Sequence, residues 1–225
     1  MTDAPRFAVT VAATYRPLVT LQALHDRLGI TAATNDPEMI RLVRARSDAI
    51  AAWCGLAADQ TGGRTFAVET MTATWLSADC ARSTRLLLPW RVPLISITSI
   101  VEDGVTLDAD DYRTVPMGAM LERIGSDGET PCLWSSAPIV VTYTAGWTAA
   151  NIDGTDMPAD LQDACLQECT TRWRARGRDP GLRSETVPDL HAWVQGYGQD
   201  GERNQLLPET EAMLAAGGYR NPAVG

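Results

Sequence analysis

Ile139-Val140-Val141-Thr142-Tyr143-Thr144-Ala145-Gly146-Trp147 is the stretch of sequence that decides the fold, together with the later segment Met157-Pro158-Ala159-Asp160-Leu161-Gln162-Asp163-Ala164. The first segment has the period of a strand, with Ile139, Val141, Tyr143 and Ala145 on one face and Val140, Thr142 and Thr144 on the other. Gly146 marks a turn, and Pro158 suits the first position of a helix, where its missing N–H costs no hydrogen bond. The two segments therefore predict a buried strand, a loop and a helix.

The sequence around this stretch predicts an α+β fold. A short helix is expected from Thr20 to Leu28, with Gly29 as its stop, and a longer one between Asp36 and Gly55; each is opened by a capping residue. Short runs rich in β-formers, with the hairpin signal Asp103-Gly104, predict antiparallel strands in the middle of the chain. Helix returns at Pro158, and a short helix is expected from Asp189 to Tyr197.

These segments divide the chain into four parts. We expect an N-terminal arm (1–17), a small bundle of about four helices (18–57 and 156–200), an inserted antiparallel β domain (63–147) and an extended C-terminal tail (201–225).

Composition excludes several classes of protein. All 19 basic residues are arginine, so a phosphate-binding P-loop and Schiff-base chemistry, which need lysine, are excluded. The formal net charge of −9 disfavours a dedicated DNA binder. Five cysteines without a C-x-x-C pair favour buried thiols in a reducing compartment. No apolar run is long enough for a membrane span, and the first sixteen residues do not form a secretory signal.

A series of short motifs resembles the head-to-tail connector (adaptor) family of long-tailed bacteriophages and phage-like gene transfer agents. The motifs occur in the family's order, and none is specific alone. They are Leu18-Val19-Thr20-Leu21, Trp53-Cys54-Gly55, the run from Leu88 to Ile97, the run from Asp108 to Arg113, the strand and proline-led helix quoted above, and Leu206-Leu207 with Tyr219-Arg220.

The resemblance implies a structural protein that forms a ring, with twelve copies expected, between the portal and the stopper or tail-completion protein. The ring would extend the DNA channel, with DNA only as passing cargo, and would lie in the neck of the virion after assembly from the host cytoplasm. We expect no catalytic residue, metal ligand, cofactor or membrane contact, because no acid, base and nucleophile converge in the sequence.

Two alternatives stay open. The first is a tail-completion or terminator protein of the same particle. The second is a small metal-dependent nuclease using Asp108, Asp110 and Asp111, although a carboxylate cluster beside a hairpin more often caps turn N–H groups.

Two sets of residues are candidates for binding partners. Arg172, Arg174 and Arg176 are expected at a subunit interface, where they would pair with acidic groups of a neighbouring copy, with contact to DNA in the channel as the lesser alternative. The resemblance assigns portal binding to the C-terminal segment, namely Leu206, Leu207, Met213, Leu214, Tyr219 and Arg220. Flanking glycines would detach this segment from the preceding domain, so that its removal leaves the domain folded; equally, the segment could pack as a helix on its own domain.

Overall fold

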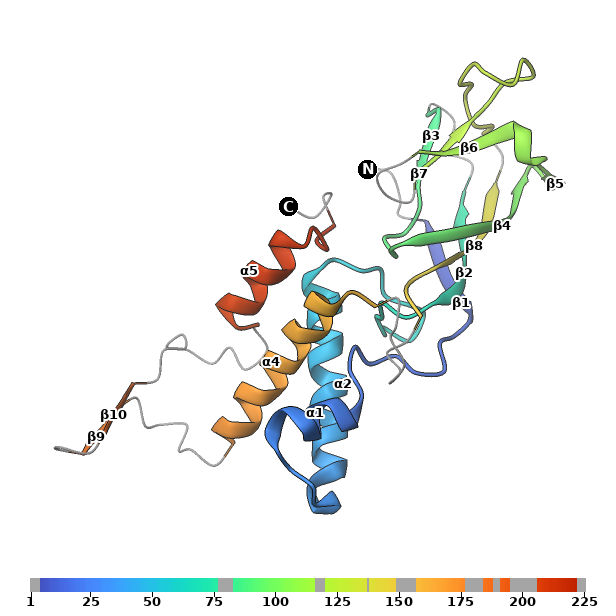
Figure 1. Ribbon diagram of the computed structural model, residues 1–225. Helices are drawn as coiled ribbons and strands as arrows, with labels where there is room; N and C mark the ends of the chain where they lie inside the picture. The colour runs from blue at the N-terminus through green and yellow to red at the C-terminus, as the bar shows by residue number, and fades with distance from the viewer. Residues whose placement is uncertain are drawn as a thin grey trace.

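A computed structural model describes residues 5–76, 83–115, 120–136, 138–148, 157–176, 184–187, 191–194 and 206–221 of the chain. Its elements form two parts, a bundle of α-helices and a block of antiparallel strands that lies beyond one end of the bundle (Figure 1). The α+β class predicted from the sequence is confirmed.

Four α-helices occur in the described residues. They are α1 (Leu21–Leu28), α2 (Asp36–Trp53), α4 (Ala159–Ala175) and α5 (Pro208–Ala216), with a short 3-10 turn, η1 (Ala33–Asn35), before α2. The side chain of Thr20 accepts the N–H of Ala23 and caps α1, and Gly29 ends α1 in the left-handed conformation, as predicted. Pro158 stands one residue before the first helical residue of α4, because its extended backbone precedes the helix.

The strands form two larger antiparallel sheets and one hairpin. The strands are β1 (Arg6–Val11), β2 (Glu69–Trp75), β3 (Arg85–Leu87), β4 (Leu94–Glu102), β5 (Val105–Thr106), β6 (Tyr112–Val115), β7 (Met120–Arg123), β8 (Ile139–Ala145), β9 (Ser184–Val187) and β10 (His191–Val194). The five-stranded sheet has the order β1-β2-β8-β4-β5, and the three-stranded sheet has the order β3-β7-β6. A 3-10 turn, η2 (Ala109–Asp111), precedes β6.

The stretch quoted first in the sequence is the central strand, β8, of the five-stranded sheet. Ile139, Val141, Tyr143 and Ala145 are buried, whereas the alternate residues are only half-buried, so the predicted faces are confirmed. β8 pairs with β2 on one side and β4 on the other. The chain then turns at Gly146, and the N–H of Trp147 donates to the carbonyl of Phe66 at 2.7 Å.

The N-terminal arm predicted for residues 1–17 includes a strand. Arg6–Val11 is strand β1, at the edge of the five-stranded sheet.

One side chain closes the β1 edge of this sheet at its middle. The Gln60 amide oxygen accepts the N–H of Val9 at 2.9 Å, and the Gln60 amide nitrogen donates to the carbonyl of Val9 at 3.1 Å. Gln60 therefore satisfies two of the backbone groups that a further strand would use.

Each part has its own hydrophobic core. The bundle core is formed by residues from α1, α2, α4 and α5, including Leu24, Ile50, Leu161 and Leu214. The β core is formed between the two larger sheets, where Ile100, Leu121, Trp134 and Val141 are fully or almost fully buried. β8 contributes to the β core, and α4, the next helix along the chain, contributes to the bundle core. The sequence from β8 to α4 therefore leads from one core to the other.

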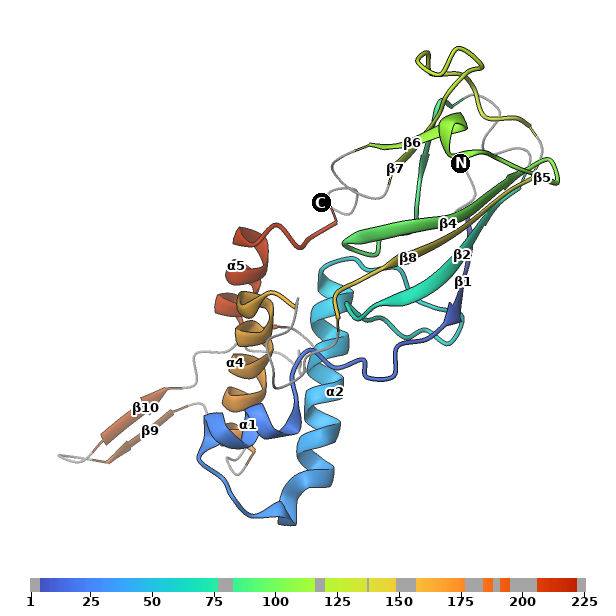
Figure 2. The same cartoon turned by 45° about the vertical axis from the view of Figure 1, so that its right-hand side comes forward.

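The end of the chain differs from a detached tail. In both views α5 lies beside α4 (Figure 2), and Leu206, Leu207 and Leu214 are buried against the bundle. Beyond α5, the N–H of Asn221 donates to the carbonyl of Cys54 at 2.8 Å. The alternative that this segment packs on its own domain therefore describes residues 206–221.

The short helix expected from Asp189 to Tyr197 is wrong for the residues that the structure describes there. His191–Val194 is strand β10, which pairs antiparallel with β9. Half of the residues in these two segments, Thr186, Val187, Trp193 and Val194, are of types that favour strands over helices. The β9–β10 hairpin extends away from the bundle (Figure 1).

Candidate functional site

The acidic cluster proposed for a nuclease is part of a turn. Asp108 and Asp111 form a capping box around η2, in which the Asp111 side chain accepts the N–H of Asp108 at 3.1 Å. A carboxylate oxygen of Asp111 also lies 3.4 Å from the Arg123 guanidinium. Turn capping, the structural role predicted for this cluster, is confirmed, and in the described part of the chain no group of three His, Cys, Asp or Glu side chains could hold a metal ion.

The arginines of the predicted subunit interface lie near the C-terminal end of α4 and have different surroundings. Arg172 donates to the buried carboxylate of Glu168 at 3.0 Å. The guanidinium carbon of Arg176 lies 3.2 Å from the centre of the Trp173 ring, within the range of a cation–π contact. Arg174 is exposed. Arg172 and Arg176 therefore each have a partner on α4 itself, Glu168 for Arg172 and the ring of the buried Trp173 for Arg176.

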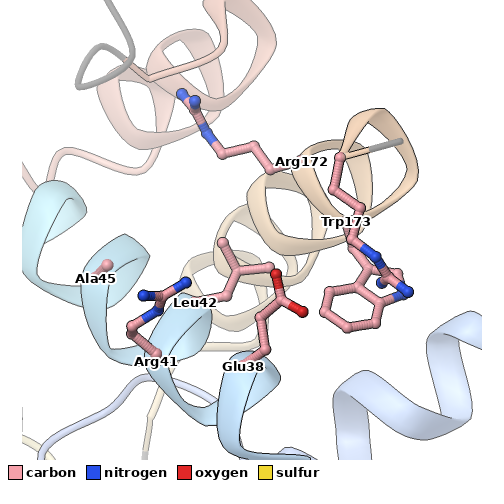
Figure 3. A pocket seen from close by; sticks show the side chains of 7 residues that line it. Glu38, Arg41, Leu42, Ala45, Arg172 and Trp173 are labelled. Atoms are coloured by element: carbon pink, nitrogen blue, oxygen red, sulfur yellow. The ribbon is translucent and has the colours of Figure 1, made fainter. Parts of the chain in front are cut away.

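A groove of about 280 Å³ lies between α2 and α4 at this point. Figure 3 shows Leu42 of α2 and Trp173 of α4 with the Glu38 side chain between them. The groove is lined by Glu38, Arg41, Leu42 and Ala45 of α2 and by Arg172, Trp173 and Arg176 of α4. Sequence reasoning missed the α2 half, because a solvent-facing arginine on a helix gives no local signal that another helix lies beside it.

The predicted portal-binding residues do not form one free surface. Leu206, Leu207 and Leu214 are buried, and Met213 and Tyr219 pack against the bundle core. Only Arg220 in this set is exposed, and its guanidinium lies 5.2 Å from the centre of the Trp53 ring. Portal binding by this segment stays a prediction, restricted to the parts of Met213, Tyr219 and Arg220 that solvent reaches.

Two polar contacts hold this segment on α4. A carboxylate oxygen of Glu168 accepts the backbone N–H of Leu207, the residue that precedes α5. The hydroxyl of Tyr219 donates to Asp160 at 2.6 Å, and the Tyr219 ring meets Trp147 edge-on at 6.0 Å between ring centres. α5 is thus fixed at both of its ends to α4 and to the turn that follows β8.

A buried ion-pair network joins the two parts of the molecule. Arg16 lies 2.7 Å from Asp59 and 2.8 Å from Glu69, and Arg91 lies 3.4 Å from the second oxygen of Glu69. Burial disfavours the charged form of Asp59, but hydrogen bonds from Thr61, Arg16 and nearby backbone outweigh it and hold the pKa of Asp59 well below its usual range. Sequence reasoning missed this network because its members come from four separate segments.

The histidine on α1 has a structural contact. His25 is buried, and its Nε2 lies 2.9 Å from a carboxylate oxygen of Asp36, the first residue of α2. His191 lies in β10.

Within the described residues, no helix is both long and apolar enough to cross a membrane.

Comparison with known proteins connects the geometry to a biological setting. No family model matches the chain, and no curated protein matches it either. Two solved structures share its fold: a chain of the neck of an empty gene transfer agent particle (TM-score 0.53, 19% identity) and a chain of the virion of a native gene transfer agent particle (TM-score 0.51, 18% identity). Each comparison covers 81% of this chain and 89% of the other. The bundle and the two sheets together therefore have the fold of a protein chain found in the neck of gene transfer agent particles, in agreement with the resemblance in the sequence motifs.

Proposed function

We propose that this protein is a structural head-to-tail adaptor, which forms a ring between the portal and the stopper or tail-completion protein of a phage-like particle. The fold match carries the proposal, because it includes 81% of this chain and 89% of a chain from a particle neck. A match of that extent includes both the bundle and the β block. The motif order in the sequence supports the same assignment independently of the fold.

The charge distribution supports a conduit for DNA. The protein has a net charge of −9, and Arg16, Arg85, Arg113, Arg123 and Arg172 each form an ion pair with a carboxylate of the same chain. Paired arginines have little capacity to neutralise phosphates, and phosphate neutralisation provides most of the affinity of non-specific binding. DNA is accordingly proposed as passing cargo, with the neck of the virion as the location and the host cytoplasm as the place of synthesis.

The partners of the ring are proposed by analogy with its position. One face would contact the portal, through the accessible parts of Met213, Tyr219 and Arg220, and the other would contact the stopper or tail-completion protein. The copies of the ring, twelve by the sequence resemblance, would contact one another through surfaces that include the end of α4. No catalytic step, cofactor or membrane is part of the proposal.

Deletion of the gene in a producing strain tests the proposal. The expected result is DNA-filled heads without tails, together with free tails, and a plasmid copy should restore whole particles. Reconstruction of the neck of wild-type particles should then place the chain directly below the portal. Normal particles from the deletion strain would disprove a neck role.

A binding experiment separates the adaptor from the terminator alternative. The purified chain should bind the portal of the same genome and fail to bind the tail-tube protein. Binding to the tube protein alone would identify a terminator.

A further inference from the structure

We propose that the groove between α2 and α4 receives the β4–β5 hairpin of a second copy of this chain. The inference deepens the proposed ring, on which it rests, by assigning its two complementary surfaces. The groove is the one lined by α2 and α4 in Figure 3. The hairpin comprises the end of β4, the turn Asp103-Gly104 and β5.

The groove combines an apolar floor with an excess of positive charge. Leu42 provides most of the floor, because Trp173 is almost buried and its ring is covered by the Arg176 guanidinium. Arg41, Arg176 and Glu38 stand around the floor, and the third arginine, Arg172, is paired with Glu168. Arg41 and Arg176 are exposed, and no ion pair is found for either within the described residues. The protein has a net charge of −9, so a local group of arginines is unusual on its surface. The groove is complementary to an acidic partner surface that carries an apolar side chain at its centre.

The β4–β5 hairpin has the opposite character. Val105 is 65% exposed, more than any other large apolar side chain described as exposed. Asp103 precedes it at the turn, and Asp108 and Asp110 follow it; all three are exposed. The turn is fixed, because Asp103 adopts a positive φ of 51° and its N–H donates to the carbonyl of Pro138 at 3.3 Å. The hairpin is therefore a preformed projection with one apolar side chain among carboxylates.

The two surfaces cannot meet within one chain. β5 lies at the end of the β block farthest from the bundle in both views (Figures 1 and 2), whereas the groove lies between the first turns of α2 and the last turns of α4. Contact between them joins different patches on two copies, which is the heterologous arrangement that generates rings when the rotation closes. Val105 would rest on Leu42, with the aspartates beside Arg41 and Arg176.

A disulfide trap tests the contact directly. Cys80→Ser and Cys132→Ser remove the two cysteines that are not known to be buried; the other three are buried. In that background, Ala45→Cys in the groove is mixed with Val105→Cys under mild oxidation at high protein concentration. The matched control mixes Ala45→Cys with Val11→Cys, because Val11 is 63% exposed at the opposite edge of the same sheet.

The expected result is a linked pair for Val105→Cys well above the control, with the joined peptide identified by mass spectrometry. Equal yields in the two mixtures, or no link in either, would overturn the proposal. The double change Arg41→Glu and Arg176→Glu should lower the yield to that of the control. Adding Asp103→Arg and Asp110→Arg on the Val105→Cys partner should restore it.

The outcomes distinguish this inference from the proposed function. A link in purified protein, with particles that assemble normally after gene deletion, would retain the contact and reject the neck role. Neck reconstructions that show a ring, without the Ala45–Val105 link, would retain the neck role and reject this contact. The residues changed in the groove, in the hairpin and at Val11 are exposed, and melting curves of each variant verify that the fold is intact.

Discussion

A carboxylate oxygen of Glu168 on α4 accepts the backbone N–H of Leu207, while the second oxygen of Glu168 receives Arg172 at 3.0 Å. Glu168 has no exposed surface, so one buried carboxylate joins the last helix of the chain to α4 and neutralises an arginine of the groove. The position of α5 and the shape of the groove therefore depend on the same side chain.

Replacement of Glu168 should destabilise the bundle strongly. Glu168→Ala removes the acceptor of the Leu207 N–H and a carboxylate that pairs with Arg172, so we expect a loss of about 3 kcal/mol in the free energy of unfolding. Glu168→Gln retains an acceptor for Leu207 and should cost less. Urea unfolding followed by tryptophan fluorescence measures both, and equal stability of Glu168→Ala and wild type would contradict the assigned role.

The C-terminal helix should be part of the folded domain. Leu214 is 1% exposed in the bundle core, and Leu214→Ala should lower stability by about 3 kcal/mol. Removal of residues 207–225 should destabilise the bundle, in contrast to the expectation of a detachable tail. Met213→Ala is the control, since Met213 is only half-buried. Thermal melting by circular dichroism measures all three, and an unchanged melting temperature for the truncated chain would restore the detached-tail interpretation.

Acid should weaken the junction between the two parts. Because the pKa of Asp59 is lower in the folded chain than in the unfolded chain, its contribution is fully present above the unfolded pKa of about 4 and is lost as pH falls below that value. Asp59→Asn should be less stable than wild type at neutral pH and should lose less stability between neutral pH and acid. Denaturant midpoints across that range check the sign; parallel curves would show that Asp59 does not contribute.

Gly146 should resist substitution more than other glycines. Its φ is 117°, and a Cβ there would collide with the carbonyl of Ala67 and lie 2.8 Å from the carbonyl oxygen of Phe66. Gly146→Ala should therefore cost about 3 kcal/mol, from backbone strain and displaced neighbours. Gly62→Ala is matched, since Gly62 also has a positive φ but has open space around it, and should cost about 1 kcal/mol. Chemical denaturation of the two variants measures the difference.

Duplex DNA should bind weakly to the free protein. Most arginines with described contacts are paired within the chain, so we expect a Kd on the order of 10⁻⁴ M at physiological salt. Fluorescence anisotropy with a labelled duplex measures it. Submicromolar binding, lost on Arg41→Glu with Arg176→Glu, would show that the groove holds nucleic acid instead of protein.

The sequence predicted the elements of the fold whose signals are local. Alternation of apolar and polar residues located the central strand, and Thr20 and Gly29 located the limits of α1, because capping chemistry depends on a few adjacent residues. β1 was missed because its residues show no clear period: Phe7, Ala8 and Val9 are apolar in succession. β10 was predicted as a helix because its few residues carry no clear period.

The contacts that build the candidate site depend on the tertiary arrangement. Arg41 and Trp173 are separated by more than half of the chain, and only the packing of α2 on α4 brings them to one groove. Similarly, apolar residues such as Leu206 and Leu214 are expected both in a segment that binds a partner and in a helix of the core. Burial decides between the two, and burial is a property of the folded chain.

The two hydrogen bonds between the Gln60 side chain and strand β1 affect how the free subunit can associate with other chains. A strand from another molecule could extend this sheet at its β1 edge only by displacing the Gln60 amide from both the N–H and the carbonyl of Val9. The opposite border differs, because β5 pairs with only the last two residues of β4. Growth of the sheet by pairing with another chain is therefore opposed at the β1 edge.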